Sequence, residues 1–421
     1  MSVAAGNQLN TSISFDQVRE CLVQEISSQC EEKGWVFRGK TPLDATAICL
    51  YQANRLQAVI VVMRANACYF KELSRLPDEA LRNTLFIDSI WIDANAIVNK
   101  IIPLILYFAL RRGRIWGLEN IATLIPKPNT QIPLATFLNL EPLKKIPEFN
   151  IDNQIKIGMA QRLAYSGVKI YEKISEEDQK ILPQYFVGEI IETFNHWLNQ
   201  FYQGSWARSI LEETISKEQY ICSLLNMHQF VKYTTRLCAR CVAHSSDIVL
   251  RNHYINHLKG EINHELMIEK DLQALGGDVD YLLHQHIPMI EINEFLSIQE
   301  SIIGYKQDPV LMLACPLVAE GITAFMRKDF IQHLHNIVSG WGIQPETATK
   351  FLTSHMHTDG GEDGHWQLVV NMLQQKILDE VRLQQFLCMM RTAMNGFARG
   401  FNATIDNLKL WEVVPLNAGP N

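Results

Sequence analysis

The stretch His257-Leu-Lys-Gly-Glu261-Ile-Asn-His264, which continues in a helical pattern to Leu275, decides how the second half of the chain folds. Glu261 and His264 are three residues apart, so on one continuous helix they project from the same face. A Glu-x-x-His pair at this spacing is one way in which a bundle helix holds iron. His257, two turns before His264 on that face, is either a further ligand or a partner of the ligands. The alternative is a solvated polar face that also carries Glu265.

Two later segments carry the same kinds of side chain. Glu320 stands in an almost wholly apolar run from Pro316 to Phe325, where a buried carboxylate needs a hydrogen-bond partner or a cation. The segment 355–365 contains three histidines and three acids within eleven residues. These residues are His355, His357, Asp359, Glu362, Asp363 and His365. Carboxylates and imidazoles on three helical segments suit iron or manganese inside a helical bundle.

The two halves of the chain have different patterns. From about residue 180 onward helical periods predominate, interrupted by short breakers such as Gly276-Gly277 and Gly360-Gly361, which predicts an all-α bundle. The region before it mixes strand and helix patterns, which predicts a mixed α/β domain. The expected fold class is therefore α+β with two domains. The predicted boundaries are 1–180 for the first domain, 181–216 for a helical linker and 217–421 for the bundle.

Hydrophobic periodicity predicts the individual elements. In the first domain we expect a helix over 15–33, a hairpin from 45–51 and 56–63, strands over 84–92, 118–125 and 155–171, and a helix over 95–112 that ends at Gly113. In the second half we expect helices over 185–203, 217–246, 248–274, 291–305, 310–338, 345–355, 362–378 and 380–408.

Composition narrows the functional class. The chain has 421 residues, 47% hydrophobic and 20% charged, as in ordinary globular proteins. Its net charge of −7 argues against a general nucleic-acid binder. No apolar run has the length of a membrane span, and the N-terminus lacks the pattern of a signal peptide, so we expect a cytoplasmic protein. Nine scattered cysteines indicate reduced thiols, and the close pair Cys238 and Cys241 is typical of helix packing.

The half from about Lys217 to Leu410 resembles the haem-oxygenase-like di-iron oxidases, relatives in fold of the TenA-type bundles. That family has a Glu and a His on one helix, a Glu on a second, and a His-x-x-x-Asp-x-x-His run on a third. The matching residues here are Glu261, His264, Glu320, His355 and Asp359.

The resemblance implies a non-haem iron-dependent oxidoreductase with two Fe(II) ions per site and O₂ as co-substrate. Glu261 and Glu320 would be its catalytic carboxylates. Related enzymes N-oxygenate amines, cleave C–C bonds of amino acids or decarboxylate fatty acids, so an amine, amino-acid or acyl substrate in a biosynthetic pathway is expected. Aromatic candidates for the pocket lining are Phe230, Tyr233, Tyr254, Phe325 and Trp366.

The chain departs from the family at one ligand position. The last histidine of the family run corresponds to position 362, where this chain has Glu362. Either Glu362 replaces that histidine, or the break at Gly360-Gly361 allows Asp363 or His365 to take its role. A mononuclear site is the alternative to a dinuclear one.

The first domain resembles the GNAT acyltransferase superfamily, which implies binding of acyl-CoA or an acyl carrier. The resemblance rests on the hairpin, the strand 84–92, the long helix, the strand 118–125 and the segment Phe137–Leu143. The glycine-containing pyrophosphate loop of that superfamily is replaced by Asn95-Ala-Ile-Val-Asn-Lys100. Lys100 is the positive charge there and the expected cofactor contact. The domain uses another acyl carrier or has become structural.

Arginines follow at the other end of the long helix. Arg111, Arg112 and Arg114 either contact phosphate or complement the negative end of the helix dipole.

Three interpretations remain open from the sequence. The first is the di-iron oxygenase bundle. The second is a metal-free TenA-like hydrolase or binding protein, with a nucleophile among Cys238, Cys241 and Cys315. The third is an acyltransferase for which the bundle is a scaffold. In each case we expect a small-molecule substrate, no nucleic acid, no membrane span and a homodimer.

Overall fold

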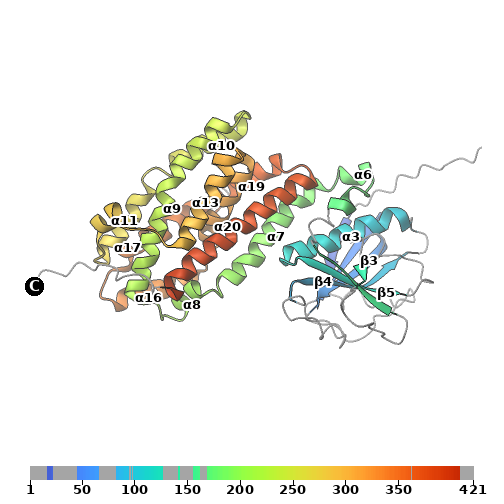
Figure 1. The fold of residues 1–421 in the computed structure, drawn as a ribbon, viewed down its shortest axis with the longest axis horizontal. Helices are drawn as coiled ribbons and strands as arrows, with labels where there is room; N and C mark the ends of the chain where they lie inside the picture. Colours follow the sequence, from blue (N-terminus) through green and yellow to red (C-terminus); the bar gives the residue numbers. More distant parts are fainter. Residues whose placement is uncertain are drawn as a thin grey trace, which may run out of the picture. The chain divides into compact units, whose positions relative to one another are not determined.

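The computed structural model describes residues 17–21, 45–65, 82–93, 96, 98–126, 141–142, 155–161, 168–361 and 363–407. The chain divides into two compact units, residues 1–193 and 194–421. The first unit contains a sheet and the second is helical (Figure 1), which confirms the predicted combination of a sheet-containing region and a helical bundle. The division lies inside α7 (Pro183–Phe201), in the segment predicted as a helical linker.

The first unit has a seven-stranded mixed sheet in the order β1-β2-β3-β4-β5-β7-β6. Its strands are β1 (Gln17–Cys21), β2 (Ala45–Gln52), β3 (Arg55–Arg64), β4 (Thr84–Ile92), β5 (Asn120–Pro126), β6 (Glu141–Pro142) and β7 (Ile155–Gln161). Among the described strands β4 and β5 pair in parallel, and α3 (Val98–Ile115) connects them. A parallel pair needs such a crossover connection.

The hairpin of β2 and β3 confirms its prediction. Ala53 and Asn54 form the turn with φ of 46° and 59°, the left-handed geometry that suits the twist of a two-residue hairpin. The predicted helix over 15–33 is wrong at its start, because residues 17–21 form β1 and pair antiparallel with β2. The remainder of that segment lies outside the described residues.

Helix α3 is the apolar core of the first unit and packs against β2, β3 and β4. It continues through Gly113 to Ile115, two residues beyond the predicted end. Lys100 lies in its first turn and is exposed. At its other end, the Nε atom of buried Arg114 lies 2.6 Å from Oε1 of Glu189 on α7.

Neighbouring arginines pair with the same helix. Nη2 of Arg111 and Nη2 of Arg112 each lie 2.8 Å from a carboxylate oxygen of Glu192. The three arginines that were candidate phosphate contacts therefore form ion pairs that join α3 to the first half of α7.

The second unit is a bundle in which α9, α13 and α20 pack against one another (Figure 1). Its helices are α8 (Ser205–Leu211), α9 (Lys217–His244), α10 (Ile248–Gly260), α11 (His264–Ala274), α12 (Val279–His284), α13 (Ile290–Glu300), the π-helical segment η3 (Ser301–Tyr305), α14 (Pro309–Met312), α15 (Ala314–Ala324), α16 (Lys328–Gly340), α17 (Pro345–Ala348), α18 (Lys350–Asp359), α19 (His365–Lys376) and α20 (Glu380–Asp406).

Two of the predicted long helices are interrupted. The segment 248–274 breaks at Asn263, whose φ of 70° is left-handed, so α10 ends at Gly260 and α11 begins at His264. Asn tolerates this conformation better than most residues. The segment 310–338 separates into α14, α15 and α16.

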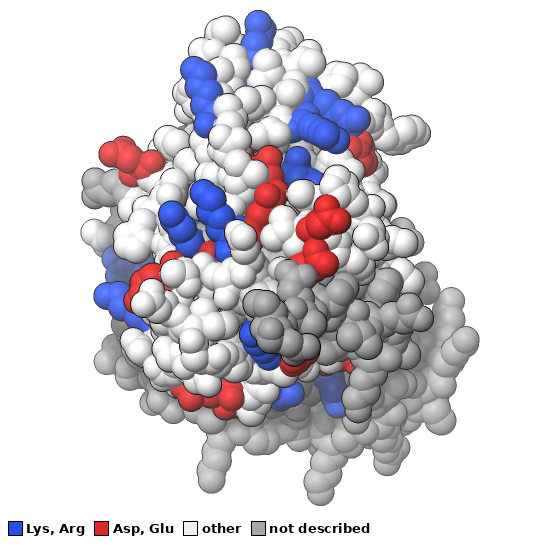
Figure 2. All heavy atoms as spheres, turned by 90° about the vertical axis from the view of Figure 1, so that its left-hand side faces the viewer, with Lys and Arg blue, Asp and Glu red and all other residues white. Residues whose placement is uncertain are grey.

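The surface of the bundle carries mixed charge. Figure 2 shows Lys and Arg interspersed with Asp and Glu on the face that it presents. Among the described residues, no single helix is long and apolar enough to cross a membrane. The segments Pro309–Ala324 and Lys328–Gly340 pass that test only as a pair, with a bend of 72° between them.

Candidate metal centre

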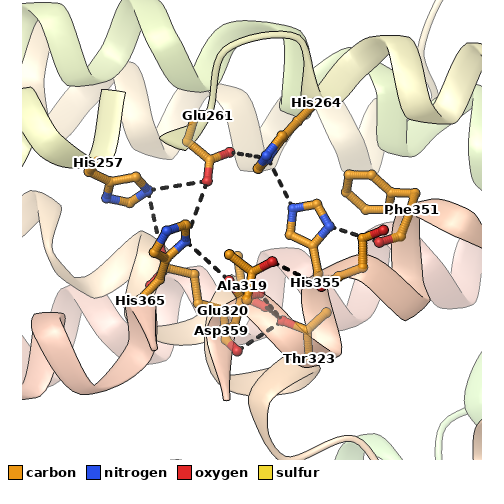
Figure 3. A network of polar contacts seen from close by, with 12 residues as sticks. His257, Glu261, His264, Ala319, Glu320, Thr323, Phe351, His355, Asp359 and His365 are labelled. Atoms are coloured by element: carbon orange, nitrogen blue, oxygen red, sulfur yellow. Dashed lines mark hydrogen bonds and ion pairs between the residues drawn. The ribbon is translucent and has the colours of Figure 1, made fainter. Parts of the chain in front are cut away.

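Acidic and imidazole side chains from α10, α11, α15, α18 and α19 converge inside the bundle (Figure 3). They are His257, Glu261, His264, Glu320, His355, Asp359 and His365. Six of them are at most 10% exposed at the side chain or residue level, and His365 is 19% exposed at the side chain. Such a density of buried ionisable groups is uncommon unless the groups bind a cation or one another.

One group consists of Glu261, His264 and His355, whose ligand atoms lie within 4.8 Å of one another. Oε2 of Glu261 and Nε2 of His355 each lie 3.0 Å from Nδ1 of His264. Nδ1 of His355 lies 2.8 Å from the carbonyl oxygen of Phe351. If Nδ1 carries the proton and donates to that carbonyl, the lone pair of Nε2 is directed at the group.

A second group consists of His257, Glu261 and Glu320, again within 4.8 Å. Nε2 of His257 lies 2.9 Å from Oε1 of Glu320 and 3.7 Å from Oε1 of Glu261. Glu261 therefore belongs to both groups and presents a different carboxylate oxygen to each.

Two further side chains lie beside the second group. Nδ1 of His365 lies 3.2 Å from Oδ1 of Asp359 and 3.9 Å from Oε1 of Glu261. The hydroxyl of Thr323 donates to Oδ2 of Asp359 at 2.5 Å, which fixes the orientation of that carboxylate.

The buried polar atoms of the second group fit a cation. Both carboxylate oxygens of Glu320, Oδ1 of Asp359 and Nδ1 of His365 are buried and make no hydrogen bond of acceptable geometry within the described part of the chain. His257 and His365 face these carboxylates as ion-pair partners, at 2.9 Å from Glu320 and 3.2 Å from Asp359. A divalent ion would supply the missing partner of these oxygens.

The distances between the ligand atoms of the first group also fit a bound metal ion. Two ligand atoms about 2.1 Å from one ion, at roughly 90° to each other, are about 3.0 Å apart. That is the separation of the histidine nitrogens and of the Glu261–His264 pair. Three carboxylates and four imidazoles form a mixed hard-oxygen and nitrogen donor set, which suits iron or manganese.

The electrostatics of the cluster depend on His257. Burial alone would lower the pKa of His257, but the carboxylates of Glu320 and Glu261 raise it to about 9. Burial raises the pKa of Glu320, while the imidazoles near Glu261 outweigh burial and lower the pKa of that carboxyl group. A proton on His257 therefore supplies positive charge that metal ions would replace, as metal binding commonly releases protons.

The predicted ligands come together in the bundle, but Glu261 and His264 lie on two helices and not on one as expected. Glu261 caps the C-terminus of α10 and His264 begins α11, so the pair does not share one continuous helix face. His355 and Asp359 do lie one turn apart on α18. Position 362 is outside the described residues, and Asp363 is exposed, whereas His365 reaches the cluster.

The sequence alone gave no defined role to two residues of this cluster, His257 and Thr323. His257 stands four residues before Glu261, and this spacing on α10 was the available signal. Thr323 gave no signal, because a threonine in an apolar helix has many ordinary roles.

A cavity of about 120 Å³ adjoins the cluster. Aromatic residues of its wall include Trp206, Phe230, Tyr254, Phe295 and Phe397, and Glu261, Glu320 and His355 form part of its polar side. Phe230 and Tyr254 line it as predicted, whereas the other three aromatic candidates, Tyr233, Phe325 and Trp366, are not part of its lining.

Three buried cysteines also line the cavity, namely Cys238, Cys241 and Cys315. Burial raises the pKa of Cys241 and of Cys315 to about 12, and that of Cys238 further. Such thiols are protonated at neutral pH and are poor nucleophiles.

Comparisons with known proteins give structural similarity without a matching family. No family model matches the chain, and no curated protein matches it. A domain of unknown function with a haem-oxygenase-like fold, from Shewanella denitrificans OS217, is similar over 53% of this chain and 94% of its own, with a TM-score of 0.47 and 16% identity. A TenA homologue from Pseudomonas syringae pv. tomato strain DC3000 is similar over 51% of this chain and 92% of its own, with a TM-score of 0.41 and 11% identity.

Proposed function

We propose that the helical unit is a non-haem oxidase or oxygenase that binds two Fe(II) ions and uses O₂ on a small amine, amino-acid or acyl substrate. The observation that carries this proposal is the position of Glu261. It is common to the two groups of potential ligands and directs one carboxylate oxygen toward each. A carboxylate shared in this way is the usual bridge of a two-metal bundle site.

The ligands divide between two ions. His264 and His355 would hold the first ion and His257 and Glu320 the second, with Glu261 as the bridge. Asp359 and His365 lie where they can complete the second ion's shell. When bound, two ferrous ions supply the electrons with which O₂ is reduced.

The protein's part is to orient these ligands and to exclude water. The Phe351 carbonyl fixes the ring of His355, and the Thr323 hydroxyl fixes the carboxylate of Asp359. The rings of Phe194 and Trp366, 6.4 Å apart between centroids, both lie against Gly321, the residue after Glu320. Ligands whose orientation is fixed in a water-poor interior favour controlled reaction at the substrate.

The cysteines support the metal proposal over a TenA-like hydrolase. A hydrolase of that kind needs a thiolate in the cavity, and burial opposes thiolate formation at Cys238, Cys241 and Cys315.

For the first unit we propose a GNAT-like fold that binds acyl-CoA or an acyl carrier. The succession of the β2–β3 hairpin, β4, α3 and β5 supports this proposal, because it is the order on which the sequence resemblance rests. Calorimetric titration of the full chain with acetyl-CoA, in parallel with Lys100→Ala, tests it. Heat of binding that Lys100→Ala weakens is the expected result, and no binding would overturn it.

Metal analysis tests the oxidase proposal. The full chain is loaded anaerobically with Fe(II), desalted and subjected to elemental analysis, and its visible spectrum is followed after O₂ is added. We expect two irons per chain and a transient absorption band. Glu320→Ala should lose iron while it keeps the helical circular dichroism, and Glu294→Ala, at an exposed position on α13, is the matched control. A wild-type chain without iron, or with zinc alone, would overturn the proposal.

A further inference from the structure

The room beside the metal cluster is small and mostly apolar. Its volume of about 120 Å³ is similar to that of an engineered cavity of about 150 Å³ that binds benzene. Trp206, Phe230, Phe295, Phe397 and Phe401 contribute rings to its wall. The size admits one aromatic ring or an aliphatic group of about six carbons, and it leaves no space for a long acyl chain.

A groove on the outside of the bundle lies next to the cavity. Leu237 on α9 and Gln299 on α13 line both the cavity and a separate groove that α9, α13 and η3 form on the outside. These two side chains therefore separate the cavity from the groove. Its lining combines the polar side chains of Tyr233, Asn293 and Ser297 with the apolar side chains of Leu237 and Leu296. The π-helical turn η3 at its rim is a kind of distortion that often marks functional sites.

The side-chain oxygen of Gln299 is buried without a partner. Gln299 is 7% exposed, and its Oε1 atom has no hydrogen-bond partner within the described part of the chain. A buried acceptor in this state is unfavourable relative to a paired one, because it has lost its hydrogen bonds to water. A ligand that donates a hydrogen bond at the neck of the cavity would recover this energy, whereas a carboxylate only accepts and would not.

From these features we infer that the site takes a compact substrate that carries an N–H group, as an amine or amide. Its apolar part of about six carbons fills the cavity beside Glu261 and Glu320, and its N–H donates to Oε1 of Gln299. Any remaining polar part extends into the groove. The identification of this compound as a substrate rests on the proposed function, whereas its binding can be measured without turnover.

Calorimetry with four probes tests the inference on the full-length chain, both metal-free and loaded anaerobically with Fe(II). The probes are benzylamine, toluene, phenylacetate and decylamine. We expect benzylamine to bind about tenfold more tightly than toluene or phenylacetate, as a charge-assisted hydrogen bond predicts, and more tightly than decylamine. Equal affinity for the first three probes, or tighter binding of decylamine, would overturn the inference.

Variants assign the contact. Gln299→Leu keeps the approximate side-chain volume and removes the acceptor, so it should weaken benzylamine about tenfold and leave toluene unchanged. Gln332→Leu, at an exposed position on α16, is the matched control. Val231→Phe should fill part of the cavity and weaken benzylamine and toluene together. Unchanged benzylamine binding in folded Gln299→Leu would exclude Gln299 as the acceptor and overturn the inference.

The experiments can contradict the oxidase proposal and the inference about the substrate independently of each other. Selective benzylamine binding by a chain that takes up no iron would overturn the oxidase proposal and support the binding site. Iron uptake by a chain that does not distinguish the probes would support the metal site and overturn the inference about the substrate.

Discussion

Nε2 of His355 lies 3.0 Å from Nδ1 of His264, although 91 residues separate the two histidines in the chain. The contact depends on the alignment of α18 with α11. Asp271 on α11 provides it, because its carboxylate accepts hydrogen bonds from the backbone N–H groups of Lys350 and Phe351 at the start of α18, at 3.0 and 2.9 Å. A side chain from one helix thus caps the N-terminus of another and sets the position of a candidate ligand.

Replacing Asp271 should weaken this alignment. Asp271→Ala leaves two backbone N–H groups without their acceptor, one buried and one partly buried, which we expect to lower the free energy of unfolding by about 2 kcal/mol. Iron content after loading should also fall, although Asp271 is not a ligand. Urea unfolding and elemental analysis measure the two effects. Asp280→Ala, at an exposed position on α12, is the control, and equal urea midpoints for the two variants would contradict the capping role.

Glu261 should affect both metal positions at once. Glu261→Ala removes the carboxylate common to the two groups, so we expect it to lower the iron content well below one per chain. His264→Ala and His257→Ala each remove a ligand of one group and should retain close to one iron. Elemental analysis of the three variants distinguishes a bridge from a terminal ligand. Two irons in folded Glu261→Ala would rule out the bridging assignment.

The sequence predicted elements best where local signals decide them. The β2–β3 hairpin was found because two runs rich in β-forming residues flank the short segment that contains Ala53 and Asn54. The break between α10 and α11 was missed because apolar periodicity continues across it, and the left-handed φ of Asn263 shows only in three dimensions. Strand β1 was predicted as a helix, because its five residues fit either period and pairing with β2 decides the outcome.

The site was partly predictable for a similar reason. Glu320 stood out as a carboxylate in an apolar helix, and its burial is confirmed. The sharing of Glu261 between two groups was not predictable, because it depends on how α10, α15 and α18 pack. Thr323 could be recognised only from its contact with Asp359.

Gly321 should be intolerant of a side chain. A Cβ atom there would lie 2.9 Å from Nε1 of Trp366 and would overlap the ring of Phe194. We expect Gly321→Ala to destabilise the chain by about 1–3 kcal/mol through overpacking and to reduce iron loading by displacing Glu320. Gly340→Ala on α16 meets nothing within 4 Å and should be neutral or slightly stabilising. Thermal unfolding compares the two variants, and equal stability would contradict the close packing.

His286 should make stability depend on pH. Burial, with the nearby positive charge of Lys232, lowers the pKa of His286 to about 4. The folded state therefore binds its proton more weakly than the unfolded state, and the contribution present above about pH 6.5 is lost as the pH falls toward 4. Relative to His286→Leu, the wild type should lose up to about 2 kcal/mol between pH 7 and pH 5.

Urea unfolding of the metal-free chain at several pH values measures this difference. His284→Leu, whose wild-type side chain is 67% exposed, should retain the full pH dependence. Parallel curves for wild type and His286→Leu would show that His286 does not titrate in this range.

Arg114 and Glu189 form a buried ion pair in the first unit, with both side chains fully buried and Nε 2.6 Å from Oε1. Removal of Arg114 leaves the buried carboxylate of Glu189 with only the more distant Nε of Arg111, 3.7 Å away, so Arg114→Met should cost about 3 kcal/mol. The double variant Arg114→Met/Glu189→Leu should recover most of this loss, because both charges are gone and apolar side chains replace them.

Hydrogen exchange of α3 peptides, followed by mass spectrometry, reports local stability in the full chain. Lys169→Met, which breaks an exposed pair with Glu172, should change it by less than about 0.5 kcal/mol. If the double variant is as unstable as Arg114→Met, the loss comes from packing of the arginine side chain and the pair is not the source of the stability.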